Sequence, residues 1–172
     1  MIARDELWRV ATFNLWNRSG PWERRLPLIR DQLRALDADA IALQEVLAFG
    51  GRTQADEIID GWGWHVHHAP AWDIGGGLTF GNAIISPHRL LDPASFALPT
   101  PAGLDTRSVV FARVDAPHGP IPLFATHLTV QFHLCGVRCE QVVALAEHVA
   151  RLAPIGGPPP VIAGDFNAHP DA

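Results

Sequence analysis

The stretch PVIAGDFN, residues 160–167, decides the fold because a short apolar run leads directly into an aspartate. Three other runs have the same form: WRVATF before Asn14, AIAL before Gln44 and Glu45, and IPLFAT before His127. Each run has the length and the Val, Ile, Phe and Ala content of a buried strand, and helix-like stretches follow most of them. In α/β proteins, ligands bind where strands end at their carboxyl edge. We therefore expect these polar side chains to meet at one edge of a sheet.

The hydrophobic pattern predicts strands and helices that alternate along the chain. Apolar residues at helical spacing predict an amphipathic helix over 22–36. Two further helices are expected over 53–59 and 136–152. Strands are expected over 8–13, 40–44, 61–68, 81–86, 108–114, 121–127 and 160–164. Residues 92–106 are rich in Pro, Thr and Ala and are expected to form a surface loop. This mixture of hairpins and crossovers favours stacked sheets flanked by helices over a purely parallel sheet.

Composition indicates an ordinary globular protein. The 172 residues are enough for one domain, 1–172, with a real core, and 48% hydrophobic against 18% charged residues excludes a disordered chain. The apolar runs are far shorter than the roughly 20 residues that span a bilayer. The first residues, MIARDELWRVATFNLW, do not resemble a signal peptide, so a cytoplasmic location is the expectation.

The charge pattern argues against a protein that coats long nucleic acids. All 13 basic residues are Arg, the net charge is −5, and the longest basic run is Arg24-Arg25. Sequence-independent binding of DNA or RNA depends on a basic stripe that neutralises phosphates, and none is visible. Nucleic acid is not excluded as a partner, because a bound metal ion can neutralise phosphate charge locally.

The GDFN stretch carries two oxygen-bearing side chains, Asp165 and Asn167, which an extended chain would place on the same side. There they could orient a water molecule, although an Asx turn is the alternative for such residues. Gly164 is expected to allow a tight turn. Together with Glu45 and His127, they form a set suited to a divalent cation and phosphate ester cleavage.

Six stretches of the chain resemble the endonuclease/exonuclease/phosphatase superfamily, in the family's order and over nearly the whole length. They are TFNLW (12–16), ALQE (42–45), GNAIIS (81–86), TRSVVFARV (106–114), ATHL (125–128) and GDFNAHP (164–170). The resemblance implies the DNase I-like fold, a four-layer α/β sandwich in which helices flank two central mixed β-sheets. It also implies Mg²⁺-dependent hydrolysis of a phosphate ester, with Mn²⁺ as the alternative ion.

The resemblance assigns a role to each matched residue. Glu45 is the principal Mg²⁺ ligand, and Asn14 beside it contacts the metal or a bound water. His127 contacts the scissile phosphate, Asp165 orients or deprotonates the attacking water, and Asn167 binds a phosphate oxygen. Arg107 is expected near the substrate phosphate. From the residues alone, Asn14 could instead cap a loop, and His127 could be a satisfied core histidine.

The chain also departs from the family pattern, because it contains no Asp-His pair of the kind that ends the family's active site. We therefore expect a chain that is incomplete at its C-terminal end and belongs to a longer active enzyme. The alternative is an inactive binding or regulatory module of the same fold. The favoured substrate is a small soluble or lipid-head-group phosphodiester, and a phosphomonoester is a further candidate. Cleavage of DNA or RNA is the alternative function.

Other residue groups receive a structural interpretation. His65 and His67 share one strand face that could bind zinc, but an edge-strand surface is favoured because no third ligand lies nearby in sequence. Cys135 and Cys139 are expected to be free, partly buried thiols in a helix. Trp16 follows the TFNL stretch and either lines the substrate pocket or packs in the core.

Overall fold

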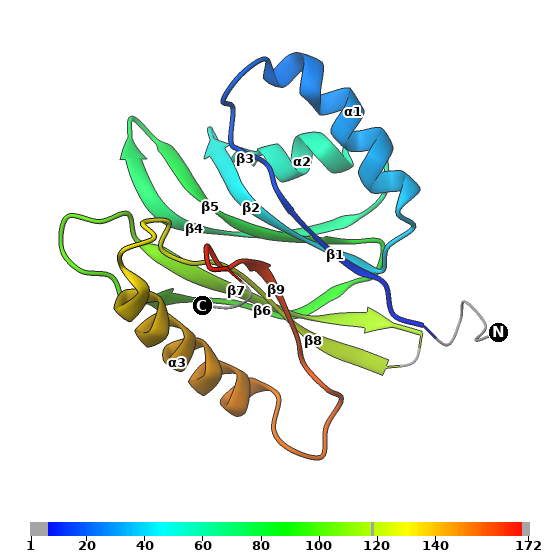
Figure 1. Ribbon diagram of the computed structural model, residues 1–172. Coiled ribbons are helices and arrows are strands. Elements are labelled where there is room, and N and C mark those ends of the chain that lie inside the picture. The colour runs from blue at the N-terminus through cyan, green and yellow to red at the C-terminus, as the bar shows by residue number, and fades with distance from the viewer. Residues whose placement is uncertain (1–6, 118, 170–172) are drawn as a thin grey trace.

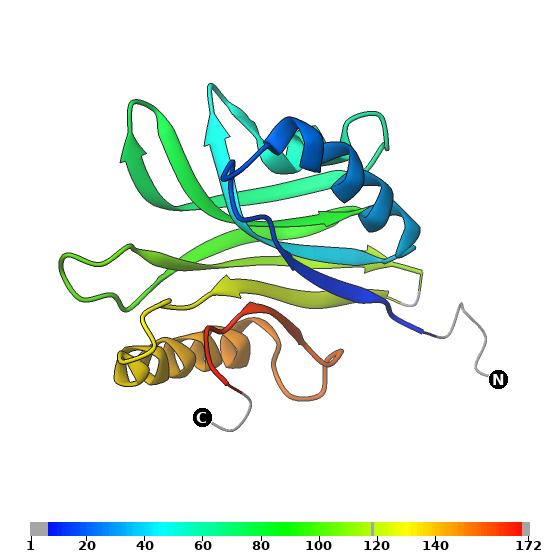
Figure 2. The ribbon, with the colours of Figure 1, turned by 45° about the horizontal axis from the view of Figure 1, so that its top comes forward.

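Two β-sheets stack between helices in the computed structural model, which describes residues 7–117 and 119–169 (Figure 1). The strands are β1 Val10–Asn14, β2 Ala40–Phe49, β3 Arg52–Thr53, β4 His65–Gly75, β5 Leu78–Ser86, β6 Leu90–Leu98, β7 Arg107–Ala116, β8 Gly119–His127 and β9 Val161–Asp165. The helices are α1 Trp22–Ala35, α2 Gln54–Ile59 and α3 Cys135–Leu152. Helices α1 and α2 cover one sheet, and α3 covers the other (Figure 2). The expected four-layer sandwich is confirmed.

Both sheets are mixed, and their parallel pairs position the polar strand ends. The first sheet has the order β1-β2-β5-β4, with β3 beside β2, and the second has the order β6-β7-β8-β9. Strand β1 runs parallel to β2, with Asn14 opposite Gln44, and β8 runs parallel to β9, with His127 opposite Asp165. The edge strands β1 and β9 contact each other across the sandwich. The carboxyl ends of both parallel pairs therefore meet.

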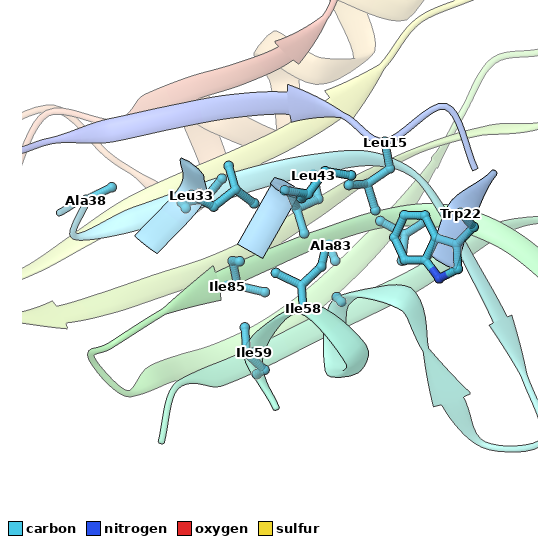
Figure 3. Packing of buried hydrophobic residues seen from close by; sticks show 13 residues of the cluster. Leu15, Trp22, Leu33, Ala38, Leu43, Ile58, Ile59, Ala83 and Ile85 are labelled. Atoms are coloured by element: carbon cyan, nitrogen blue, oxygen red, sulfur yellow. The ribbon is translucent and has the colours of Figure 1, made fainter. Parts of the chain in front are cut away.

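The hydrophobic core fills three layers between these elements. Figure 3 shows the cluster under α1 and α2, where Leu33, Leu43 and Ile58 are among the buried side chains. The layer between the sheets consists mainly of Ala and Val, whose small side chains allow the two sheets to approach closely. Burial of each Leu or Ile contributes about 1.5–3 kcal/mol, so this core holds the strand ends in place.

The expected loop over 92–106 is wrong in its first half, because β6 occupies Leu90–Leu98. Ala94, Phe96 and Leu98 alternate inward at strand spacing against β7. Pro93 is the reason for the error, since proline in a sequence favours a loop over a strand. It lies where the register shifts on an edge strand, and a proline that lacks the N–H is tolerated there.

The end of β2 also differs from expectation. Strand β2 continues past residue 44 to Phe49, because a β-bulge between Leu43 and Val46 absorbs the polar pair without ending the strand. Gly76 and Gly77, with φ of 64° and 79°, make the tight turn between β4 and β5. None of the described helices combines the length and the hydropathy needed to cross a lipid bilayer.

Candidate active site

Asn14 joins the ends of the two sheets. Its Nδ2 donates to Glu45 Oε1 at 3.2 Å and to Asp165 Oδ2 at 3.1 Å, and its Oδ1 accepts from the Trp16 backbone N–H at 2.8 Å. The Trp16 bond assigns the amide orientation, because only oxygen can accept that proton. Asn14 therefore directs its NH₂ group towards the carboxylates and uses its oxygen within the loop.

Glu45 lies on the β-bulge of β2, with φ of +58°. A bulge redirects a side chain out of the ordinary strand alternation, and bulges are frequent beside active sites. The second carboxylate oxygen, Oε2, accepts from Asn17 Nδ2 at 3.2 Å. Each oxygen of Glu45 thus receives one amide N–H bond among those that the structure describes, and each keeps a lone pair.

Asp165 ends β9 and forms an Asx turn, since its Oδ1 accepts the Asn167 backbone N–H at 3.0 Å. Asn167 has φ of +48°, so the chain leaves the extended conformation that the sequence pattern favoured. The Asn167 Nδ2 donates to the Leu128 carbonyl at 3.0 Å, and this amide has a second N–H. Asp165 and Asn167 are neighbours through a turn rather than through strand alternation.

Gly164 has a steric role rather than the expected turning role. A Cβ atom built at Gly164 would lie 2.1 Å from the Thr126 carbonyl oxygen, so only glycine fits where β9 pairs with β8. This close approach brings Asp165 beside His127.

His127 and Arg107 supply nitrogen atoms on the β8 and β7 side of the cluster. His127 Nε2 lies 3.8 Å from Asp165 Oδ2, and both His127 and Arg107 are buried. Burial and, to a lesser degree, nearby Arg107 lower the pKa of His127 from 6.5 to about 4, and Asp165 opposes the shift. At neutral pH the imidazole is uncharged, so positive charge here comes from Arg107.

Two buried nitrogen atoms of this pair have no hydrogen-bond partner in the described part of the chain. His127 Nδ1 and Arg107 Nε have no hydrogen bond to any described residue. Buried polar groups are nearly always satisfied, so unpaired nitrogen atoms at the end of a sheet point to a ligand or to water. Burial lowers the pKa of Arg107, and the carboxylates of Asp105, Glu45 and Asp165 oppose that change.

A cavity of about 560 Å³ opens beside these side chains, between the edges of the two sheets. Asn14, Asp165 and Asn167 line one side of it, with Gln44 and Phe132 around them. Trp16 is 58% exposed, so the core-packing alternative for this residue is wrong. The six residues expected from the sequence lie in one region: Asn14, Glu45, Arg107, His127, Asp165 and Asn167.

Asn17 is a site residue that the sequence reasoning missed. Its bond to Glu45 joins residues 28 positions apart, and no spacing rule indicates such a contact. The only sequence signal was its place three residues after Asn14, in the loop that follows a strand end.

The oxygen donors of this cluster suit one type of divalent-cation site. Residues 7–117 and 119–169 contain no group of three His, Cys, Asp or Glu side chains placed to hold a metal ion. Mg²⁺, however, is commonly held by one or two carboxylates, with water and substrate phosphate completing its shell. Glu45, with a lone pair on each oxygen, fits that type of site. Asn14 fits less well as a direct ligand, because its oxygen is already bonded.

The remaining histidine and cysteine candidates lie outside this cluster. His65 and His67 are on β4, an edge strand, and His67 Nε2 lies 3.2 Å from the Ala94 carbonyl oxygen. Cys135 and Cys139 are free as expected, but both are exposed rather than partly buried. The inward face of α3 is formed instead by Arg138, Gln141 and Leu145.

The model of the endonuclease/exonuclease/phosphatase family matches residues 11–172. The chain belongs to this family. Its members hydrolyse phosphoesters and are generally dependent on divalent metals. The sequence matches no curated protein at a significant level.

Solved structures with this family's fold resemble the chain closely in shape. A mannosyl-6-phosphatase of Bacteroides thetaiotaomicron has a TM-score of 0.78 at 20% identity, covering 96% of this chain and 67% of its own. The human Nocturnin catalytic domain has a TM-score of 0.74 at 22% identity, covering 95% and 65%. The D. rerio TDP2 complex with a single-strand DNA product has a TM-score of 0.71 at 16% identity, covering 94% and 61%. The chain thus spans about two thirds of the length of these structures.

Proposed function

We propose that this protein hydrolyses a phosphate ester, most favourably a phosphodiester, with Mg²⁺ bound at Glu45. The observation that carries this function is the single Asn14 amide that holds Glu45 and Asp165 together beside Arg107 and His127. Two carboxylates and a buried guanidinium within one cluster suit a cation and a phosphate better than they suit a structural role. Residues 1–172 are proposed to form one domain of this family.

Each side chain has a proposed task that follows from its contacts. Asp165 accepts two N–H bonds, which orient its carboxylate as a hydrogen-bond acceptor for the attacking water. Arg107 supplies positive charge to the phosphate, and neutral His127 supplies a hydrogen bond. The second N–H of Asn167 is proposed to donate to a phosphate oxygen. When bound, a Mg²⁺ ion would neutralise phosphate charge and stabilise the transition state.

A small phosphodiester is favoured over long nucleic acid because several arginines bind the protein's own backbone carbonyls. Arg25, Arg30 and Arg138 donate to backbone carbonyls, and so does Arg113. These side chains hold loops together and do not form a basic stripe for a phosphate backbone. Cleavage of DNA or RNA is the second candidate, since the similar TDP2 structure contains a DNA product.

The test is hydrolysis of bis(p-nitrophenyl) phosphate and p-nitrophenyl phosphate by the purified protein, with Mg²⁺, with Mn²⁺ and with EDTA. We expect cation-dependent release of nitrophenol, faster from the diester. Short single-stranded DNA and RNA in the same buffer test the second candidate. Cation binding without turnover of any of these substrates would favour the alternative of an inactive binding module.

A further inference from the structure

The side chain of Asn17 is bonded at both ends in the loop between β1 and α1. Its Nδ2 donates to Glu45 Oε2 at 3.2 Å. Its Oδ1 accepts from both the backbone N–H and the hydroxyl of Ser19, each at 2.8 Å. The Ser19 donors assign the amide orientation, so the NH₂ group must face Glu45.

The backbone of Asn17 is also held from two directions. Its carbonyl accepts from Arg25 Nη2 at 2.9 Å and from Gln54 Nε2 at 3.1 Å. Gln54 is 1% exposed, so this anchor belongs to the buried core under α2. Asn17 adopts φ of +41°, a left-handed conformation that Asn tolerates better than most residues.

One guanidinium organises the whole loop. Arg25 donates to the carbonyls of Leu15 at 2.7 Å and Ser19 at 2.8 Å, in addition to that of Asn17. Its Cζ lies 5.6 Å from the ring centre of Trp16 and 5.4 Å from that of Trp22. A planar, five-donor group suits this task, and a lysine could not make the same set of bonds.

We infer that Asn17 is a positioning residue that fixes the Glu45 carboxylate for its cation, and this rests on the proposed function of Glu45. Asn14 holds Oε1 and Asn17 holds Oε2, so the plane of the carboxylate is set before any cation arrives. A glutamate on a bulge would otherwise have several side-chain rotamers available. Partners that orient a metal ligand typically account for 10- to 100-fold in metal affinity.

The experiment compares Mn²⁺ binding by wild type, Asn17→Gly, Asn17→Ala and Ser19→Ala, using isothermal titration calorimetry. Glycine removes the amide and accommodates the positive φ, whereas alanine removes the amide and strains the backbone. We expect both Asn17 variants to raise the Mn²⁺ dissociation constant by about 10- to 100-fold. Ser19→Ala serves as the matched control and should stay within about threefold, because the Ser19 backbone N–H still holds Asn17 Oδ1.

Melting temperatures in EDTA separate positioning from folding. Asn17→Gly should melt near wild type, because the Arg25 and Gln54 contacts are to the backbone. Wild-type Mn²⁺ affinity in Asn17→Gly, or weakened affinity in Asn17→Ala alone, would overturn the positioning role and leave the proposed function standing. If wild type bound no Mn²⁺, the cation site of Glu45 would fail, and the role of Asn17 with it.

Discussion

Asn14 Nδ2 lies 3.1 Å from Asp165 Oδ2, which connects two residues that are 151 positions apart in the chain. Asn14 ends β1 of the first sheet, and Asp165 ends β9 of the second. The same nitrogen donates to Glu45, so one amide bridges two carboxylates that would otherwise repel each other. The candidate site therefore depends on the stacking of the two sheets.

Asn14→Asp should destabilise the protein when no cation is present. The variant keeps the oxygen that accepts from Trp16, but it replaces the shared donor with a third negative charge. We expect the free energy of unfolding in EDTA at pH 7 to fall by about 1–2 kcal/mol. Urea unfolding measures this, with Gln32→Glu on the exposed side of α1 as the matched charge control. An equal loss in the control would show that net charge, rather than the local cluster, is responsible.

Glu45→Gln and Asp165→Asn should each lower kcat/KM for the phosphodiester. The first removes the charge proposed to bind the cation, and the second removes the acceptor proposed for water. Contributions of several kcal/mol correspond to a loss of about a thousandfold. Initial rates are compared with those of Glu140→Gln and Asp31→Asn, which alter exposed carboxylates on α3 and α1. Activity retained in both site variants would remove the assigned roles.

His127 should titrate near pH 4, which nuclear magnetic resonance of the imidazole can measure. Since this pKa lies below the ordinary 6.5, the unfolded chain binds the proton more tightly, and stability should decrease as pH falls from 6.5 towards 4. His127→Gln should reduce that pH dependence of unfolding. Arg107→Met should raise the pKa, because it removes one of the causes of the shift. Titration of His127 near 6.5 would contradict this prediction.

Gly164→Ala should be severely destabilising, whereas Gly136→Ala should not. The added Cβ at Gly164 meets the Thr126 carbonyl oxygen at 2.1 Å, and at Gly136 on α3 it meets nothing within 4 Å. We expect a loss of about 3 kcal/mol or more for the first and a gain of up to about 1 kcal/mol for the second. Thermal unfolding of both variants tests the contrast, and equal melting temperatures would refute it.

The fold could be predicted because its signals are local. Runs such as AIAL before Glu45 and VIAG before Asp165 have strand length and composition, and the motifs follow the family's order. The prediction failed at β6, where Pro93 concealed a strand that the alternation of Ala94, Phe96 and Leu98 indicates. It also stopped β2 early at Gln44, because a bulge depends on the partner strand as much as on its own residues.

The site could be predicted only in part. The residues at strand ends were identified because parallel strands bring their carboxyl ends to the same edge. The direction of each polar group was not available from that rule. Asn14 directs its NH₂ group to the carboxylates, and Asn167 turns back to the Leu128 carbonyl.

The sequence by itself determined three things: where apolar runs of strand length end in polar residues, which residue types stand at those ends, and the family. Each of these depends on short-range pattern. Only the tertiary structure decided that Asn17 contacts Glu45 and that burial lowers the pKa of His127 to about 4. Those properties arise from burial and from contacts between distant segments. They exist only when the two sheets and the loop held by Arg25 are packed together.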